Sequence, residues 1–379
     1  MKIGILTQHL HNNYGGLLQA YALQHFLFKQ GHDVLTIDFN TKNIGATVTK
    51  KPKLWGLKDI SKNCIKKYIL RRNIKSILPF SPSEEEKASV GRETRRFLAE
   101  NIRTTQKLTD INQFSYLESY NFDAYIVGSD QVWRPRYSPG LSAFFLKFLG
   151  EDKKTKRIAY AASFGVDNCD EYTQDELIEY TKLAKKFNGI AVREDSAVDL
   201  CKKHFSVTPE HVIDPTMLLE KESYIELVQK DNIPFSPGNM MVYVLDQSPE
   251  KINMINKVST IKNLKPFTVM PSETSGIYPP VTQWLRGFID AEYVVTDSFH
   301  GVAFSIIFNK QFIAIGNKDR GLARFTSVLK KFDLTSRLVL DASELSEDKI
   351  NTEIDFAKVN EIKKKEQSFA FDFLQKNLA

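Results

Sequence analysis

The chain has 379 residues, which favours two domains over one because a single hydrophobic core rarely serves more than roughly 250–300 residues. Hydrophobic residues make up 42% of the chain and charged residues 26%, the proportions of an ordinary globular protein. The formal charge of +6 is too small to indicate a partner, and we expect no nucleic-acid partner.

The cysteine content and the hydropathy of the chain further limit the class of protein and the compartment in which it is expected. Three scattered cysteines, Cys64, Cys169 and Cys201, exclude a disulfide framework and a CxxC metal site, and they fit a reducing cytoplasm. The first apolar run ends after Thr7, too early for a signal peptide. No run approaches the roughly 20 apolar residues of a membrane span. We therefore expect a soluble cytoplasmic protein.

Basic residues are concentrated between Lys50 and Arg103, in the runs KKPK, KK, RR and RETRR. Such a belt fits contact with an anionic membrane surface or with phosphates, and a solvated charged face remains the simpler interpretation of each run. Residues 41–120 otherwise read as a helical insertion, with a basic amphipathic helix expected at residues 55–72. We expect the insertion to lie on the side of the molecule where an acceptor substrate would bind. We also expect residues 50–103 to make peripheral contact with the inner face of the membrane.

The start of the chain predicts a strand, a glycine loop, a helix and a second strand. Residues 2–7 are apolar and strand-like, residues 17–30 carry apolar side chains at helical spacing, and VLTIDF is the second strand. Gly15 and Gly16 fall between the first strand and the helix, where glycine permits close approach of a ligand to a helix N-terminus. The pair fits a binding loop and a tight turn without ligand equally well.

Two later strands of the first half also end in polar residues. AYIVG is followed by Ser129, Asp130 and Gln131, and IAV is followed by Arg193 and Glu194. Ligands of open α/β sheets bind outside the carboxyl ends of the strands, so these residues are candidates for ligand contact. An arginine there is suited to hold a carboxylate or phosphate, although a lone arginine usually caps or bridges.

The second half begins after DNIPFSPGN, whose prolines and glycine make it the best linker. We predict an α/β fold with an N-terminal Rossmann-like domain at 1–230, a C-terminal Rossmann-like domain at 231–355, and a helix at 356–379 that packs back on the first domain. The C-terminal domain contains AEYVVTDSFHGVAFSIIFNKQFIAIG, which predicts a strand, a polar turn, a short helix and a strand.

The polar turn holds Asp297, Ser298, His300 and Gly301 at the end of a predicted strand. An acid, a hydroxyl and an imidazole at that position fit a catalytic site. The alternative is that Asp297 or Ser298 is only an N-cap and that His300 is a packed core histidine. For the turn as a whole we favour a site.

The chain resembles the polysaccharide pyruvyl transferase family. The resemblance rests on six segments in order: NYGGLLQAYAL, YIVGSDQVWRP, IAVREDSA, VIDPTMLL, VVTDSFHGVAFSIIFNKQF and ARFTSVLKKFDLTSRLV. It implies two Rossmann-like domains facing across a cleft, a glycosyltransferase-B-like arrangement. It also implies transfer of the enolpyruvyl group of phosphoenolpyruvate onto two hydroxyls of a sugar as a ketal, with release of phosphate. The acceptor would be a cell-surface polysaccharide precursor, often lipid-linked, and phosphoenolpyruvate would be a co-substrate with no further cofactor and no metal.

The resemblance assigns roles to individual residues. Arg193 matches the arginine of the family's V-R-[DE] motif, Arg324 lies in another family segment, and Arg320 is a nearby extra cation. His300 matches the family histidine, with Asp297 or Glu194 as its acid–base partner. Ser298 stands where many members carry an arginine, so one anion holder of the relatives is absent. The full set of predicted substrate-binding residues is Arg193, Ser298, Gly301, Arg320, Arg324, Gly15, Gly16, Ser129, Asp130 and Gln131.

Two other functions compete with this one. A glycosyltransferase that uses a nucleotide sugar shares the two-domain architecture, but it needs a base and ribose pocket. The turn DSFHG at 297–301 is short for that, and PSETSG at 271–276 is the only other candidate. An inactive carbohydrate-binding relative would explain Ser298, and it predicts sugar binding without turnover. We rank both below the pyruvyl transferase.

Overall fold

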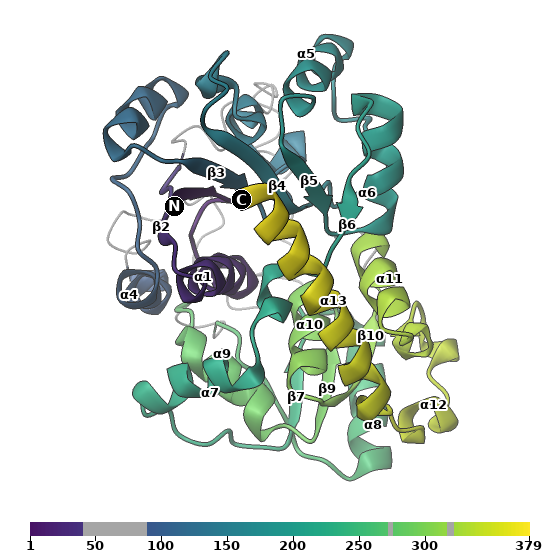
Figure 1. The fold of residues 1–379 in the computed structure, drawn as a ribbon. Helices are drawn as coiled ribbons and strands as arrows, with labels where there is room; N and C mark the ends of the chain where they lie inside the picture. The colour runs from purple at the N-terminus through teal and green to yellow at the C-terminus, as the bar shows by residue number, and fades with distance from the viewer. Residues whose placement is uncertain (41–88, 272–275, 317–321) are drawn as a thin grey trace, which may run out of the picture.

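The computed structural model describes residues 1–40, 89–271, 276–316 and 322–379. Within them lie two parallel sheets, with strand order β2-β1-β3-β4-β5-β6 in the first and β11-β10-β9-β7-β8 in the second. Figure 1 shows the sheets in the upper and lower halves of the molecule, with helices around each. This is the expected fold, two Rossmann-like halves in a glycosyltransferase-B-like arrangement.

The strands of the first sheet are β1 (Lys2–Leu6), β2 (Asp33–Thr36), β3 (Ala124–Val127), β4 (Lys156–Ala162), β5 (Gly189–Val192) and β6 (Glu210–His211). Its helices include α1 (Tyr14–Lys29), α4 (Arg92–Asn101), α5 (Gln174–Ala184) and α6 (Asp195–Leu200). The strands β1, β3 and β4 are almost completely buried, as expected for a parallel sheet covered on both faces.

The second sheet contains β7 (Met240–Tyr243), β8 (Pro266–Phe267), β9 (Tyr293–Thr296), β10 (Gln311–Ile315) and β11 (Leu338–Val339). Its helices include α7 (Lys221–Lys230), α8 (Pro249–Lys262), α9 (Val281–Asp290), α10 (Phe299–Ile307), α11 (Leu322–Lys331) and α12 (Glu347–Asn351). The predicted strand–helix–strand unit at 291–316 is therefore confirmed as β9, α10 and β10.

Two helix starts differ from the prediction. The helix after β1 begins at Tyr14, so Gly15 and Gly16 lie in its first turn and not in a loop. Similarly, α10 begins at Phe299, so His300 and Gly301 belong to a helix and not to a turn. In both cases glycine and polar residues are typical of loops in a local sequence pattern. The pattern carries no information about the tertiary contacts that require these residues within a helix.

One apolar core runs through both halves. The same cluster of buried side chains contains Ile5 of β1 and Phe304 of α10. At the junction Tyr14 stacks on Trp284 with ring centroids 5.8 Å apart, and the Tyr14 hydroxyl donates to the Pro279 carbonyl at 2.8 Å. The boundaries placed at residues 230 and 355 stay a prediction, because the core does not stop at either.

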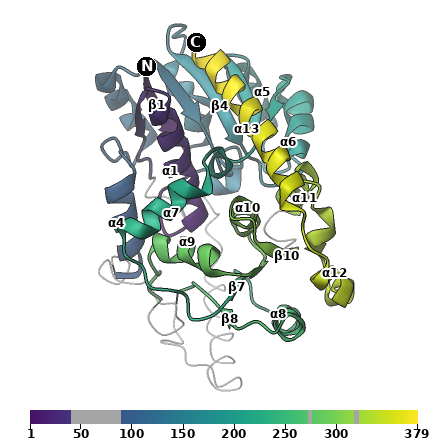
Figure 2. The same cartoon turned by 60° about the horizontal axis from the view of Figure 1, so that its bottom comes forward.

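The last helix, α13 (Phe356–Leu378), spans the two halves (Figures 1 and 2). Near its middle Lys363 forms an ion pair with Glu220 at 2.8 Å, and Gln367 donates to the Met217 carbonyl at 3.0 Å. Toward its end Phe373 lies against Tyr160 of β4, with ring centroids 6.4 Å apart. The helix therefore fastens the C-terminal half to the first sheet.

The basic belt falls mostly outside the described residues, as do the predicted helix at 55–72 and most of the insertion at 41–120. The described end of that region, α4, meets the second half through Arg96, whose guanidinium makes two hydrogen bonds to Asp231, at 2.6 and 2.8 Å. Among the described helices, none is both long and apolar enough to cross a bilayer.

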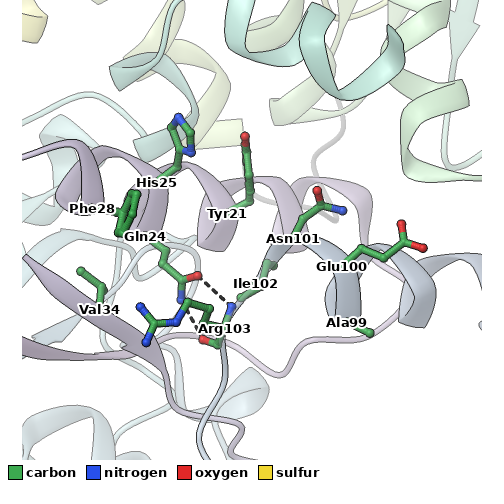
Figure 3. Close-up of a pocket in the computed structure, with 10 residues that line it drawn as sticks. All are labelled: Tyr21, Gln24, His25, Phe28, Val34, Ala99, Glu100, Asn101, Ile102 and Arg103. Carbon is green, nitrogen blue, oxygen red and sulfur yellow. Dashed lines mark hydrogen bonds between the residues drawn. The ribbon is translucent and has the colours of Figure 1, made fainter. Parts of the chain in front are cut away.

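A cavity of about 240 Å³ lies at the C-terminal half of α1, beside α4 (Figure 3). Beneath it Gln24 accepts a hydrogen bond from the Arg103 amide and donates one to the Arg103 carbonyl, each at 2.8 Å. These bonds fix the chain that leaves α4 against α1. The polar cluster described next lies at the opposite, N-terminal end of α1.

Candidate active site

Five charged or titratable side chains meet where the two halves join; we call them the junction cluster. The first half contributes Asp130 after β3, Arg193 after β5 and Asp214 after β6, and the second half contributes His300 from α10 and Arg324 from α11. The three residues of the first half follow the carboxyl ends of parallel strands, the usual position of a ligand site in this fold. The cluster therefore depends on both halves being in place.

Arg193 is the centre of the cluster. Its Nη1 lies 2.8 Å from Asp214 Oδ2 and its Nη2 lies 3.3 Å from Asp130 Oδ1. The guanidinium carbon also lies 4.4 Å from the centroid of the Phe299 ring, a cation–π contact. Arg193 is only 4% exposed, so it is not a cleft residue that could be removed without affecting the fold.

Asp214 is held in one orientation. Its Oδ1 accepts hydrogen bonds from the Thr216 amide at 3.0 Å and the Thr216 hydroxyl at 2.8 Å. Its Oδ2 accepts from Arg193 and, at 3.3 Å, from the Ser129 hydroxyl. Burial raises the pKa of Asp214, whereas His300, Arg193 and the Thr216 amide lower it, and the net direction is downward. Asp214 is therefore a buried, ionised carboxylate.

His300 faces that carboxylate from the other half. Its Nε2 lies 3.9 Å from Asp214 Oδ2, and the residue is 6% exposed. Burial lowers the pKa of His300; Asp214 and Asp130 oppose this, whereas Arg193 and Arg324 reinforce it, and the net direction is downward. His300 is thus neutral near pH 7 and suited to accept a proton.

Gly15 explains why α1 must carry glycine next to His300. A Cβ atom built on Gly15 would lie 2.0 Å from His300 Nδ1, far inside van der Waals contact. A Cβ on the neighbouring Gly16 would lie 3.2 Å from the nearest atom, in Asn13. The backbone of α1 therefore lies directly against the imidazole ring, and Gly15 sets the position of the ring.

Gly15→Ala should displace His300 or separate the two halves locally. We expect a loss of about 1–3 kcal/mol in the free energy of unfolding from overpacking, although alanine is the better helix former by about 1 kcal/mol. Urea denaturation measures the difference. Gly16→Ala is the matched control and should stay within about 1 kcal/mol of the native chain. Equal effects of the two substitutions would contradict a specific contact between Gly15 and His300.

Asp297 does not face His300 as the sequence suggested. Its carboxylate accepts hydrogen bonds from the amides of Leu245 and Asp246, at 2.7 and 3.2 Å, and forms an ion pair with Lys251 at 2.6 Å. It thereby joins the end of β9 to the loop after β7. The carboxylates that act on His300 are Asp214 and Asp130, so the acid–base pairing expected from sequence proximity is corrected.

Gly301 lies beneath His300 for a packing reason. A Cβ there would lie 2.1 Å from Thr296 Oγ1, which itself donates to the Tyr243 carbonyl at 2.7 Å. Ser298, the residue before α10, makes no side-chain capping bond, and its amide donates to Thr296 Oγ1 at 3.1 Å. These contacts hold the first turn of α10 close to the end of β9 and thereby fix the position of His300.

Glu194 clasps the loop after β4. Its Oε1 accepts hydrogen bonds from the Ser163 hydroxyl and from the amides of Phe164 and Gly165, at 2.8–2.9 Å. Its Oε2 is buried, and Arg193 Nε lies 4.0 Å from it. Glu194 therefore holds the loop after β4 in place beside the junction cluster.

The other predicted residues of the first half divide between the cluster and its support. Asp130 belongs to the cluster. Burial raises the pKa of Asp130, but Arg193, His300 and Arg324 lower it by more, so the net direction is downward and the carboxylate is ionised. The Ser129 hydroxyl donates to the Ala161 carbonyl at 2.8 Å, and the Ser129 amide donates to Gln19 Oε1 at 3.0 Å. Gln131 accepts from Arg134 at 3.1 Å and lies against Gly165. Ser129 and Gln131 thus shape the loop that presents Asp130.

Arg324 reaches the cluster from α11, with Nη1 3.9 Å from Asp130 Oδ1. Burial and the neighbouring Arg193 lower its pKa to about 10, so it stays charged at neutral pH. The helix is fastened to the first half by the Asp195 amide, which donates to Ser327 Oγ at 3.0 Å. Arg320 lies outside the described residues.

His211 of β6 lies at the contact between α11 and the first half. Its Nε2 lies 3.1 Å from the Arg193 carbonyl and 3.2 Å from Ser327 Oγ. Burial, together with Lys331, lowers its pKa to about 4. The folded protein therefore favours the neutral form of His211. The contribution of neutral His211 to the free energy of unfolding is fully present above pH 6.5 and is lost as the pH falls toward 4.

We expect acid to weaken the fold partly through His211, by up to about 3 kcal/mol. Urea denaturation at about pH 7.5 and about pH 4.5 should show a smaller loss for His211→Gln than for the native chain. The loss should not vanish, because the pKa values of His9 and His300 are also lowered. An identical loss in both proteins would show that His211 is accessible to protons in the fold.

Asp214 is the site residue that sequence reasoning missed. It lies in VIDPTMLL, directly after β6, where an Asp-Pro pair is by itself typical of a turn and does not indicate a site. Its position after a strand was the available signal, the same one that singled out Asp130 and Arg193.

Comparison with known structures agrees with this fold. The UDP-N-acetylglucosamine 2-epimerase from Rickettsia bellii superposes with a TM-score of 0.50 at 11% identity, covering 100% of this chain and 97% of that one. Arabidopsis thaliana UGT89C1 in complex with UDP-L-rhamnose gives 0.50 at 11% identity, covering 99% and 97%. At such identities the likeness concerns the fold alone. No curated protein sequence matches the chain.

A sequence family model supplies the more specific relation. The model described as polysaccharide pyruvyl transferase matches residues 13–319. The matched range contains Gly15, Asp130, Arg193, Asp214 and His300, and so four of the five residues of the junction cluster. The chain belongs to the polysaccharide pyruvyl transferase family.

Proposed function

We propose that the protein transfers the enolpyruvyl group of phosphoenolpyruvate to a sugar of a cell-surface polysaccharide precursor, forming a pyruvate ketal and releasing phosphate. The observation that carries the proposal is the meeting of neutral His300 with Asp214, Arg193 and Arg324 at the junction of the two halves. Family membership supports the transferase class, and the donor and the ketal are inferred from the chemistry below.

Phosphoenolpyruvate carries a carboxylate and a phosphate, so its site needs positive potential. Arg324 contributes to it, whereas the charge of Arg193 is balanced by Asp130 and Asp214, which engage both of its Nη atoms. The N-termini of α1 and α10 converge where Gly15 meets His300, and helix N-termini favour anions. We assign the anionic groups of the donor to this place.

The reaction needs proton transfers at both ends of the donor. The first sugar hydroxyl adds to carbon 2 of phosphoenolpyruvate and loses its proton, while the methylene carbon takes up one proton, so that the carbon–carbon double bond is consumed and a methyl group forms. The second hydroxyl then displaces phosphate at carbon 2, and its proton leaves with the phosphate. His300, neutral at pH 7, accepts the proton of an attacking hydroxyl, a contribution worth about 10²–10⁴ in rate.

Phosphoenolpyruvate should raise the melting temperature of the native chain, because a ligand that binds only the folded state stabilises it. The gain is about 2.7 kcal/mol at a concentration 100 times the Kd. Differential scanning fluorimetry with phosphoenolpyruvate, UDP-glucose and sulfate measures the effect and its specificity.

A rise with UDP-glucose and none with phosphoenolpyruvate would replace the proposal with a nucleotide-sugar transferase. A rise with all three anions alike would indicate nonspecific binding to cations. Binding of a saccharide without a response to phosphoenolpyruvate, and without phosphate release, would indicate an inactive carbohydrate-binding protein.

A further inference from the structure

Asp214 and His300 form a pair across the junction of the two halves, and nothing in the sequence placed them together. The Asp214 carboxylate lies on the Nε2 side of the ring, 3.9 Å away. That distance is longer than a hydrogen bond, so the contact is electrostatic. Nε2 is buried and makes no hydrogen bond within the described chain. A fixed negative charge therefore faces one identified nitrogen of the ring.

The two ring nitrogens lie in different surroundings. Nδ1 lies on the side of Gly15, in the first turn of α1. The positive end of a helix dipole favours a lone pair over an N–H group. The carboxylate of Asp214 favours an N–H group over a lone pair. Both influences place the single proton of neutral His300 on Nε2.

We infer that Asp214 is a positioning residue for His300: it keeps the proton on Nε2 and leaves Nδ1 as the nitrogen that exchanges a proton with substrate. The part that concerns substrate rests on the proposed function, whereas the tautomer does not. Asp214 is suited to the task because Thr216 and Arg193 hold its carboxylate in place.

Other charged groups also act on the ring. Asp130 lies on the same side of the junction as Asp214 and raises the pKa of His300, while Arg193 and Arg324 lower it. Asp214 differs from Asp130 in that its Oδ2 lies 3.9 Å from Nε2, within ion-pair distance of the ring. Its removal should therefore alter the ring more than removal of any other carboxylate.

The test is nitrogen-15 spectroscopy of the histidine rings in the full chain, with His300 identified by the signals that His300→Gln lacks. We expect the native protein to show the Nε2–H tautomer above the titration of His300. In Asp214→Asn we expect the Nδ1–H form to appear and the titration midpoint to fall by about 1 pH unit.

Asp297→Asn is the matched control, since it removes a buried carboxylate three residues from His300 whose partner is Lys251. It should leave the tautomer unchanged. If Asp214→Asn does not fold, Thr216→Val loosens the same carboxylate without removing its charge and should produce a smaller change of the same sign.

A native Nδ1–H tautomer would overturn the inference, as would an unchanged tautomer and midpoint in Asp214→Asn. Neither reading depends on phosphoenolpyruvate. A chain that shows the expected tautomers but no response to phosphoenolpyruvate would refute the proposed donor and leave the Asp214–His300 pair intact.

Discussion

His300→Gln should lower turnover by a factor of roughly 10²–10⁴ while phosphoenolpyruvate still raises the melting temperature. Glutamine keeps hydrogen-bonding capacity and approximate volume but cannot take up a proton near neutral pH. Because burial lowers the pKa of His300, the native enzyme should keep its activity at pH values somewhat below 6.5, where an exposed histidine would already be protonated. Phosphate release in the presence of the saccharide acceptor measures turnover.

His25→Gln is the matched control for this substitution. His25 is a partly buried histidine on α1, beside the cavity of Figure 3 and away from the junction cluster. It should keep native turnover. A His300→Gln protein with near-native turnover and a lower melting temperature would make His300 a packed core residue. A loss of donor binding at unchanged turnover would make it a holder of the donor.

Arg193→Ala should cost about 3–5 kcal/mol of folding stability, a large fraction of the 5–15 kcal/mol of a typical domain. The substitution leaves Asp130 and Asp214 buried without the cation that holds both, and buried unpaired charge is expensive. It also removes the contact with Phe299 at the junction. Urea denaturation of native and variant protein gives the difference.

Arg103→Ala provides the control, because Arg103 forms an ion pair with Asp33 at 2.9 Å in which both side chains are more than half exposed. Its loss should cost no more than about 1 kcal/mol. Should Arg193→Ala remain as stable as Arg103→Ala and lose only the response to phosphoenolpyruvate, Arg193 would be a direct donor ligand and its ion pairs of little energetic weight.

The strands and their polar ends could be predicted because they are local features. Runs such as YVV and AYIV are apolar on both faces, and a change to Asp, Ser or Arg at their ends is visible without knowledge of the fold. That rule led to Asp130, Arg193 and the turn around His300, although Asp214 escaped it because an Asp-Pro pair after a short strand is typical of a turn.

The partners of these residues could not be predicted, because they come from the other half of the chain. Asp297 is three residues from His300 in sequence, yet its carboxylate is bound to Lys251, while Asp214, 86 residues away, faces the ring. Gly15 is more distant still in sequence. Residue 15 must be glycine because the His300 ring packs against it, and the sequence around Gly15 does not show this contact. Sequence spacing describes one face of a helix or strand, and the junction brings two such faces together.

The core shared by the two halves has a consequence for how the molecule opens. Separating the sheets would expose Tyr14, Trp284 and Phe304 to water, and such apolar burial is worth about 25 cal/mol per Å². Amide hydrogens of β1 and β9 should therefore exchange with solvent through the same global event, although each belongs to a different sheet. Fragments that contain only one half would lack part of that core, so folding cooperativity extends over both, and a ligand held at their junction protects the whole chain.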